Sequence, residues 1–180
     1  MNKKLKLEEL NRLSIEDFKK SAKDPIIVLL DNVRSLNNIG SVFRTCDAMG
    51  ISKVYLCGIT AQPPHREIRK TAIGATKSVD WEYAENALEI IKKYKKLNYS
   101  LIAVEQTSES ISLENYAHNM VKTLLIFGNE IDGVSQNLID ECDISLEIPQ
   151  YGTKHSMNIS VTTGIVLWSL KMQKLSKEQQ

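Results

Sequence analysis

Short apolar runs alternate with longer amphipathic segments along most of the chain. The first run, PIIVLL (25–30), is rich in β-branched residues, as is typical of a buried strand. Four similar runs follow: KVYLCG (53–58), YSLIAVEQT (99–107), TLLIFG (123–128) and ISLEIP (144–149). Helical periodicity lies between them, most clearly in ENALEIIKKYKKLN (85–98). This alternation predicts an α/β fold, a mostly parallel sheet with helices on both faces.

The segment before the first strand has a different pattern. Residues 7–22 predict a short helix or a pair of helices, with Ser14 placed to cap the part that begins at IEDF. No linker, repeat, low-complexity tract or change in composition divides the rest of the chain. We therefore predict one domain over residues 1–180, with a short helical extension over 1–24.

Composition narrows the class of protein. With 42% hydrophobic and 25% charged residues, the 180-residue chain can bury a core and is predicted to be globular. No window approaches the about 18 consecutive apolar residues that span a membrane, and MNKKLKLEEL lacks the apolar core of a signal peptide. We expect a soluble, cytoplasmic protein without a membrane partner. Cys46, Cys57 and Cys142 are widely spaced among apolar neighbours, which favours reduced core thiols.

The net charge of +1 gives no overall attraction to nucleic acid, so RNA binding would need a local basic patch. The segment PPHREIRKTAIGATK (63–77) holds five basic side chains against one glutamate: His65, Arg66, Arg69, Lys70 and Lys77. Arg34 and Arg44 precede it. An ordinary solvated helix face has the same composition, so both interpretations stay open.

The stretch NNIGSVFRTCDAMG (37–50) combines a helical stripe with polar residues. Its apolar positions recur at i, i+3, i+4, i+7 and i+10: Ile39, Val42, Phe43, Cys46 and Met49. Gly50 is placed to end this helix. Asn37 and Asn38 stand at its start, where an asparagine side chain can cap a free backbone N–H.

Capping does not account for Arg44. It lies about 140° around the helix from Ile39 and one turn after Gly40, so its side chain would lean back toward Asn38. A cation and an amide at a helix start favour an anionic ligand such as phosphate. A surface arginine without a ligand is the alternative, and spacing alone does not separate the two.

Two polar loops follow apolar strands later in the chain. FGNEIDGVS places Gly128, Asn129, Glu130 and Gly133 directly after one strand. In the other loop the strand is predicted to end at Pro149, and Ser156 is placed to cap the following helix. Parallel α/β sheets bind ligands at such strand ends. The chain has no dinucleotide or P-loop glycine motif and no spacing of histidines and cysteines that would hold a metal.

Together the three segments resemble a known family. Asn38, Gly40, Arg44 and Thr45 match N-x-G-x-x-x-R-T; FGNEIDGVS and IPQYGTKHSMNIS match the second and third motifs in the same order. Over about residues 25–172 the chain resembles the SpoU-type RNA 2′-O-ribose methyltransferases of the SPOUT superfamily. The match of three motifs in order makes this resemblance specific.

The resemblance implies an S-adenosylmethionine-dependent enzyme, a C-terminal trefoil knot, and a homodimer with its site at the subunit interface. By motif, it places a group of residues at the catalytic site: Asn38, Arg44, Glu130, Ser156 and Asn158. It places others against the cofactor: Thr107, Gly128, Ile148, Ser156 and Met157. It implies no metal.

The mechanism proposed for the family makes the arginine a base. Guanidinium is permanently charged at neutral pH, so we assign Arg44 instead to holding RNA phosphate and stabilising the developing 2′-alkoxide. Asn38 would orient the substrate, and Ser156 and Asn158 would fix the loop and the nucleotide. For Glu130 a scaffolding role and a catalytic role both stay open.

Two other functions remain possible on this fold: an RNA-binding protein without activity, and a methyltransferase that acts on a base nitrogen. The Asn38 and Arg44 pair speaks against the second. With only about 24 residues before the first strand, we expect the catalytic domain and its dimer mate to read a compact feature of tRNA. VEQTSESISLENY and EIPQYG also resemble members that methylate a D-loop guanosine; ribosomal RNA is the alternative substrate.

Overall fold

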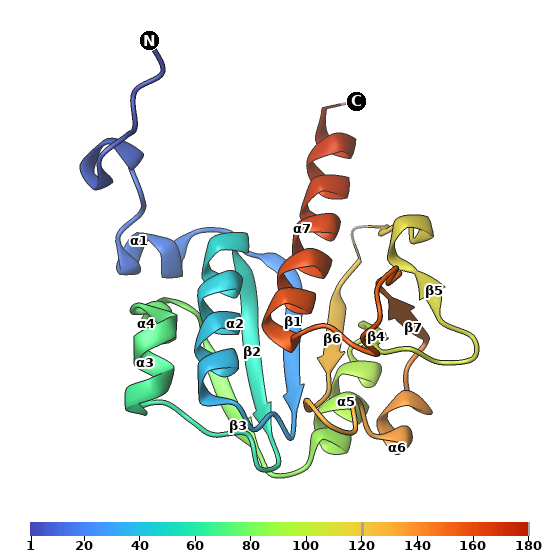
Figure 1. Ribbon diagram of the computed structural model, residues 1–180. Coiled ribbons are helices and arrows are strands. Elements are labelled where there is room, and N and C mark those ends of the chain that lie inside the picture. The colour runs from blue at the N-terminus through green and yellow to red at the C-terminus, as the bar shows by residue number, and fades with distance from the viewer. Residues whose placement is uncertain (120, 180) are drawn as a thin grey trace.

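A seven-stranded sheet forms the centre of the described part of the chain. The computed structural model describes residues 1–119 and 121–179, and all neighbouring strands in them run parallel, in the order β3-β2-β1-β6-β4-β7-β5 (Figure 1). The strands are β1 Asp24–Asp31, β2 Ile51–Cys57, β3 Trp81–Ala84, β4 Ser100–Val104, β5 Ile111–Ser112, β6 Thr123–Phe127 and β7 Ile144–Glu147. The predicted α/β fold is confirmed, and each of the five apolar runs contains a strand.

The sequence pattern does not predict β3 and β5, which form the two edges of the sheet. Neither strand contains a fully buried residue, and β5 is only two residues long. Strands of this kind carry no apolar run or alternation that could be recognised. The predicted strand at 144–149 is also shorter than expected, because β7 ends at Glu147 instead of Pro149.

Helices cover both faces of the sheet (Figure 1). One core cluster joins the sheet to α2 Leu36–Met49, α3 Arg66–Ala72, α4 Ala75–Ser78 and α7 Ile159–Glu178. The other joins it to α5 Ala87–Lys96 and α6 Gln136–Ile139. In β1, Val28 and Leu30 point into the first cluster, and Ile27 and Leu29 point into the second. Because strand side chains alternate between faces, a strand covered on both sides reads as a continuous apolar run.

The N-terminal residues form the predicted pair of short helices. A 3₁₀ turn spans Leu7–Leu10 and α1 spans Ile15–Lys20. Ser14 caps α1 as predicted, since its hydroxyl accepts a hydrogen bond from the Asp17 N–H at 3.1 Å. Within the described part of the chain, no helix has the length and hydrophobicity needed to cross a membrane.

All three cysteines are free thiols. Cys46 and Cys57 are buried and Cys142 is half-buried. Burial raises the pKa of Cys57 and of Cys142 to about 12 and also raises that of Cys46, because a thiolate is poorly solvated among apolar side chains. Cys46 and Cys57 therefore lie in the core as predicted, whereas Cys142 is only partly buried.

Helix α2 has the predicted apolar stripe, but a different residue caps it. Ile39, Val42 and Phe43 are fully buried, and Gly50 ends the helix in the left-handed conformation at φ 69°. The N-cap is Ser35, whose hydroxyl accepts a hydrogen bond from the Asn38 N–H at 3.3 Å. The capping role suggested for Asn37 and Asn38 is therefore wrong, because the helix begins before them.

Helix α3 packs directly against the first half of α2 at Gly40. A Cβ atom on Gly40 would lie 2.1 Å from the Thr71 hydroxyl oxygen and 2.4 Å from the Ile68 carbonyl oxygen. The Thr71 hydroxyl also donates a hydrogen bond to the Asn37 carbonyl at 3.0 Å. A glycine is required at position 40 because the two helices approach closely there. Its missing side chain lets α3 pack beside the start of α2.

Candidate active site

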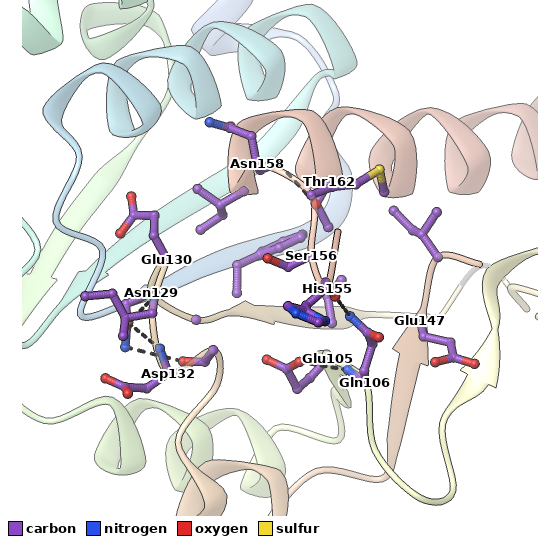
Figure 2. Close-up of a pocket in the computed structure, with 18 of the residues that line it drawn as sticks. Glu105, Gln106, Asn129, Glu130, Asp132, Glu147, His155, Ser156, Asn158 and Thr162 are labelled. Carbon is purple, nitrogen blue, oxygen red and sulfur yellow. Dashed lines mark hydrogen bonds between the residues drawn. The ribbon is translucent and has the colours of Figure 1, made fainter. Parts of the chain in front are cut away.

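A cavity of about 490 Å³ lies at the carboxyl ends of β4, β6 and β7, where parallel α/β sheets bind their ligands (Figure 2). Three segments beyond these strands and the first turn of α7 enclose it. The lining residues are Val104, Glu105, Gln106, Phe127, Gly128, Asn129, Glu130, Ile131, Asp132, Gly133, Leu146, Glu147, Ile148, Gln150, His155, Ser156, Met157, Asn158, Ile159 and Thr162.

The loop after β6 is a tight turn that forms one wall. Backbone hydrogen bonds join the N–H of Asn129 to the carbonyl of Gly133 at 3.1 Å and the N–H of Gly133 to the carbonyl of Asn129 at 3.2 Å. Gly133 has φ 66°, in the left-handed region that favours glycine. A Cβ on Gly128 would lie 1.9 Å from the Gly133 carbonyl carbon. Both glycines are therefore dictated by the turn.

Glu105, directly after β4, fastens this turn to the sheet. Its carboxylate accepts hydrogen bonds from the Val134 N–H at 2.9 Å and the Gln106 N–H at 2.8 Å. The next residue, Gln106, donates from its side-chain amide to the His155 carbonyl at 2.8 Å. Two adjacent side chains therefore hold the loops after β6 and β7 on opposite sides of the cavity (Figure 2).

The loop after β7 leads into α7 through Asn158. The Asn158 side-chain oxygen caps the helix by accepting a hydrogen bond from the Ser160 N–H at 2.9 Å. The predicted cap at Ser156 is therefore wrong, since α7 begins three residues later, at Ile159. Ser156 is exposed and lines the cavity together with Met157.

A hydrogen-bonded chain connects the three sequence motifs. The Asn38 side-chain amide donates to a Glu130 carboxylate oxygen at 2.9 Å, and the Asn158 amide donates to the Asn38 side-chain oxygen at 3.1 Å. Glu130 also accepts from the backbone N–H groups of Arg34 and Ser35, each at 3.2 Å. These bonds fix both ends of the Asn38 amide, so its orientation is set by residues far apart in sequence.

The same hydrogen bonds determine the charge on Glu130. Partial burial opposes ionisation, but the bonds from Asn38, Arg34 and Ser35 outweigh it and hold the pKa of this carboxyl below its ordinary value of 4.5. A carboxylate with a lowered pKa is a poor proton acceptor. The geometry therefore favours a positioning role for Glu130.

We expect Glu130→Gln to destabilise the fold more at pH 7 than at pH 3. Because the folded-state pKa lies below the ordinary 4.5, the carboxylate adds stability above that pH and loses it as pH falls through the folded-state pKa. Thermal melts of wild type and variant from pH 3 to 7 measure this, with the exposed Glu109→Gln as control. A difference in Tm that does not shrink toward acid pH contradicts the assignment.

Arg44 lies outside the cavity of its own chain. It is exposed on α2 and has no hydrogen-bond or ion-pair partner among the described residues. No hydrogen bond joins Arg44 to Asn38 among the described residues, and the Asn38 amide is bonded to Glu130 and Asn158. Thr107 also lies outside the lining, and its N–H donates to Ser110 at 3.3 Å in a turn.

Asn38 is not in the lining, but it hydrogen-bonds to Glu130 and Asn158, which are. The remaining predicted site residues meet at the cavity. Glu130, Ser156 and Asn158 line it, as do Gly128, Ile148 and Met157. Sequence reasoning missed several further lining residues: Glu105, Gln106, Asp132, Glu147 and His155. Glu105, Gln106 and Glu147 stand at the ends of apolar runs, and that position in an α/β sequence is the signal that could have found them.

The lining is acidic. It contains four carboxylate side chains, from Glu105, Glu130, Asp132 and Glu147, and no lysine or arginine among the described residues. Such a cavity favours a cationic or neutral ligand and repels phosphate. No group of three or more His, Cys, Asp or Glu side chains in the described part of the chain is arranged to hold a metal ion.

Comparison with known proteins gives the family. The sequence profile of the SpoU rRNA Methylase family matches residues 25–168, which include all three motifs and nearly the whole sheet. This chain belongs to the SpoU rRNA Methylase family. A relative from Aquifex aeolicus, named as a tRNA (guanosine(18)-2′-O)-methyltransferase, is 32% identical over 176 residues, covering 94% of this chain and 79% of its own length.

Solved structures of SpoU proteins have the same fold. The A. aeolicus TrmH/SpoU tRNA modifying enzyme superposes with a TM-score of 0.81 at 27% identity, covering 91% of this chain and 84% of its own. An rRNA methyltransferase from Sinorhizobium meliloti, crystallised with S-adenosylmethionine bound, gives a TM-score of 0.78 at 26% identity. That alignment covers 86% of this chain and 59% of the S. meliloti protein.

Proposed function

We propose that this SpoU family chain transfers the methyl group of S-adenosylmethionine to a ribose 2′-hydroxyl of RNA, with tRNA as the favoured substrate. One observation carries the proposal: the second and third motifs enclose one cavity, and hydrogen bonds through Glu130 and Asn158 join it to Asn38 of the first motif. These contacts between residues far apart in sequence support a single site to which all three motifs contribute.

The cavity fits the cofactor. S-adenosylmethionine carries a sulfonium and an ammonium group, which suit the four carboxylates of the lining. Ile148 and Met157 offer apolar surface to its adenine, and the turn at Gly128 leaves backbone groups within reach. When bound, the cofactor would supply an activated methyl group. Ser156, in the exposed loop, would help to close the site over it.

The chain's own residues would orient the ribose and stabilise charge. Asn38, with its amide fixed by Glu130 and Asn158, would orient the ribose or its phosphate. Arg44 would hold the phosphate and stabilise the developing 2′-alkoxide, because its guanidinium keeps its charge and donates in a planar fork. Glu130 would act through Asn38 as a positioning residue.

A homodimer would complete the site. Arg44 does not reach the cavity of its own chain, so a second copy is the simplest source of this side chain. Helix α7 also exposes an apolar stripe with helical spacing: Val161, Ile165, Trp168 and Leu175, of which Trp168 is 55% exposed.

The C-terminal trefoil knot and the cytoplasmic location stay predictions from the family resemblance and the sequence.

Light scattering is expected to give about twice the chain mass of 20.3 kDa. Trp168→Glu should shift the protein toward monomer, because a buried carboxylate without a partner opposes association. Lys92→Glu, on the opposite face of the sheet, is the control and should leave the mass unchanged. A wild-type monomer with full activity contradicts the dimer.

Methyl incorporation from labelled S-adenosylmethionine into unmodified tRNA and ribosomal RNA tests the function. We expect incorporation into tRNA, and calorimetry should detect cofactor binding in the presence of EDTA. The named tRNA activity of the 32% identical relative favours this substrate, while the named rRNA activity of the S. meliloti enzyme supports ribosomal RNA as the alternative. Cofactor binding without transfer to either RNA would favour the inactive RNA-binding protein.

A further inference from the structure

The exposed side of α3 carries a row of cations. Arg66, Arg69 and Lys70 recur at i, i+3 and i+4, so they share one face of the helix, and His65 precedes them at the N-cap. The Arg66 and Lys70 side chains are 90% and 73% exposed. Glu67 is the one acid that pairs with them among the described residues, at 4.0 and 3.9 Å, and such exposed pairs contribute little. The face is therefore free to bind an anion.

The opposite side of α3 holds this face in a fixed place. Ile68 and Ala72 are buried in the core, and the absence of a side chain at Gly40 lets the helix contact α2 closely. The hydrogen bond from Thr71 to the Asn37 carbonyl ties α3 to the residue just before Asn38. The basic face is thus rigidly attached to the first motif.

This face lies beside the residues that would contact the substrate. Arg44 follows Gly40 by one helical turn, so it extends on the side of α2 that faces α3. Figure 1 shows α3 alongside α2, and both helices start at the same end of the sheet, near the carboxyl ends of β1 and β2. Lys77 lies in α4, next to the C-terminal half of α2, because the neighbouring Ser78 hydrogen-bonds to Asp47 there. It is not part of the row.

Charge is separated between this surface and the cavity. The described lining of the cavity has four carboxylates and no lysine or arginine, whereas the α3 face with Arg44 has four permanent cations. An RNA chain carries one negative charge per nucleotide, so its backbone is repelled by the cavity and attracted to the helix face. Only the reacting nucleotide needs to approach the cavity.

We propose that the exposed face of α3, formed by His65, Arg66, Arg69 and Lys70, binds the phosphate backbone of the substrate RNA outside the reacting nucleotide. The inference rests on the proposed function, which supplies an RNA substrate. Backbone contacts position the RNA without reading its sequence. They make affinity depend strongly on salt, because each neutralised phosphate releases counterions.

Charge reversal tests this surface. The Arg69→Glu/Lys70→Glu double variant is expected to bind tRNA at least about tenfold more weakly near 0.1 M salt, with a salt slope reduced by about 1 or more. Its affinity for S-adenosylmethionine and its melting temperature should match wild type. Lys92→Glu/Lys96→Glu, exposed on α5 across the sheet, reverses the same charge and should bind tRNA normally.

The outcomes distinguish the surface from the function. If wild type methylates RNA and both double variants bind tRNA equally well, the RNA-binding role proposed for the α3 face is wrong and the proposed function stands. If wild type binds anionic phosphatidylserine vesicles through the same residues while tRNA binding is unchanged, the surface serves a membrane and the inference is overturned. A wild-type protein that neither binds nor methylates RNA contradicts the function and this inference together.

Discussion

Arg44→Ala is expected to lower the rate of methyl transfer about a hundredfold or more, the usual effect of losing a donor to the transition state. Affinity for S-adenosylmethionine should stay unchanged, because Arg44 does not line the cavity. Stability should also be unchanged, since the side chain is exposed and has no partner among the described residues. Single-turnover rates, calorimetry and thermal melts of the purified variant measure the three quantities.

Arg44→Lys separates charge from geometry. It should recover little activity, because an ammonium group cannot reproduce the planar fork of guanidinium. Nearly full activity in the lysine variant would mean that charge alone suffices. Unchanged transfer in Arg44→Ala would remove Arg44 from the site altogether.

Gly128→Ala is expected to lower cofactor affinity at least tenfold and to destabilise the fold by about 1–3 kcal/mol, the scale of overpacking a tight site. Its Cβ would lie 1.9 and 2.0 Å from the carbonyl carbon and oxygen of Gly133. Both are backbone atoms, so the turn itself must move, and Asn129 and Glu130 move with it. Calorimetry and thermal melts measure the two effects.

Gly152→Ala is the matched control for Gly128→Ala. An added Cβ at Gly152 meets nothing within 4 Å, and its φ is not in the left-handed region. Stability should therefore match wild type. Wild-type cofactor affinity and stability in Gly128→Ala would show that the turn is not part of the cofactor site.

The two variants together test whether the site is shared between subunits. If Arg44 acts on the cavity of the partner subunit, a mixed dimer of Arg44→Ala and Gly128→Ala has one complete site. With the cofactor held well below the Kd of Gly128→Ala, random mixing should then restore about a quarter of wild-type activity from two proteins that are each nearly inactive alone. If Arg44 acts within its own chain, neither site in the mixed dimer is complete and no activity returns.

Local patterns predict the scaffold well because periodicity and burial are local properties. The continuous apolar run of β1 and the stripe of α2 from Ile39 to Cys46 both appear as predicted. The edge strands β3 and β5 escape prediction because they bury too little apolar surface to leave a pattern. Strand ends also shift by a few residues, as at Glu147, where β7 ends before the apolar run does.

The role of Asn38 could not be predicted from its neighbours. An asparagine next to a helix start is predicted to be the N-cap, but the N-cap of α2 is Ser35. The partners of the Asn38 side chain are Glu130 and Asn158, which are 92 and 120 residues away in sequence. Only folding of the sheet brings them together. The motif resemblance identified the residues, and the geometry explains why Asn38 is held in one orientation.

The identity of the methylated nucleoside tests the central claim most directly. Wild-type protein is incubated with unmodified tRNA and labelled S-adenosylmethionine, and the RNA is then digested to nucleosides and analysed by mass spectrometry. We predict a 2′-O-methylated nucleoside, expected to be guanosine, that is strongly reduced with Arg44→Ala. A methyl group on a base nitrogen, or no methylated nucleoside in tRNA or ribosomal RNA, would contradict the account.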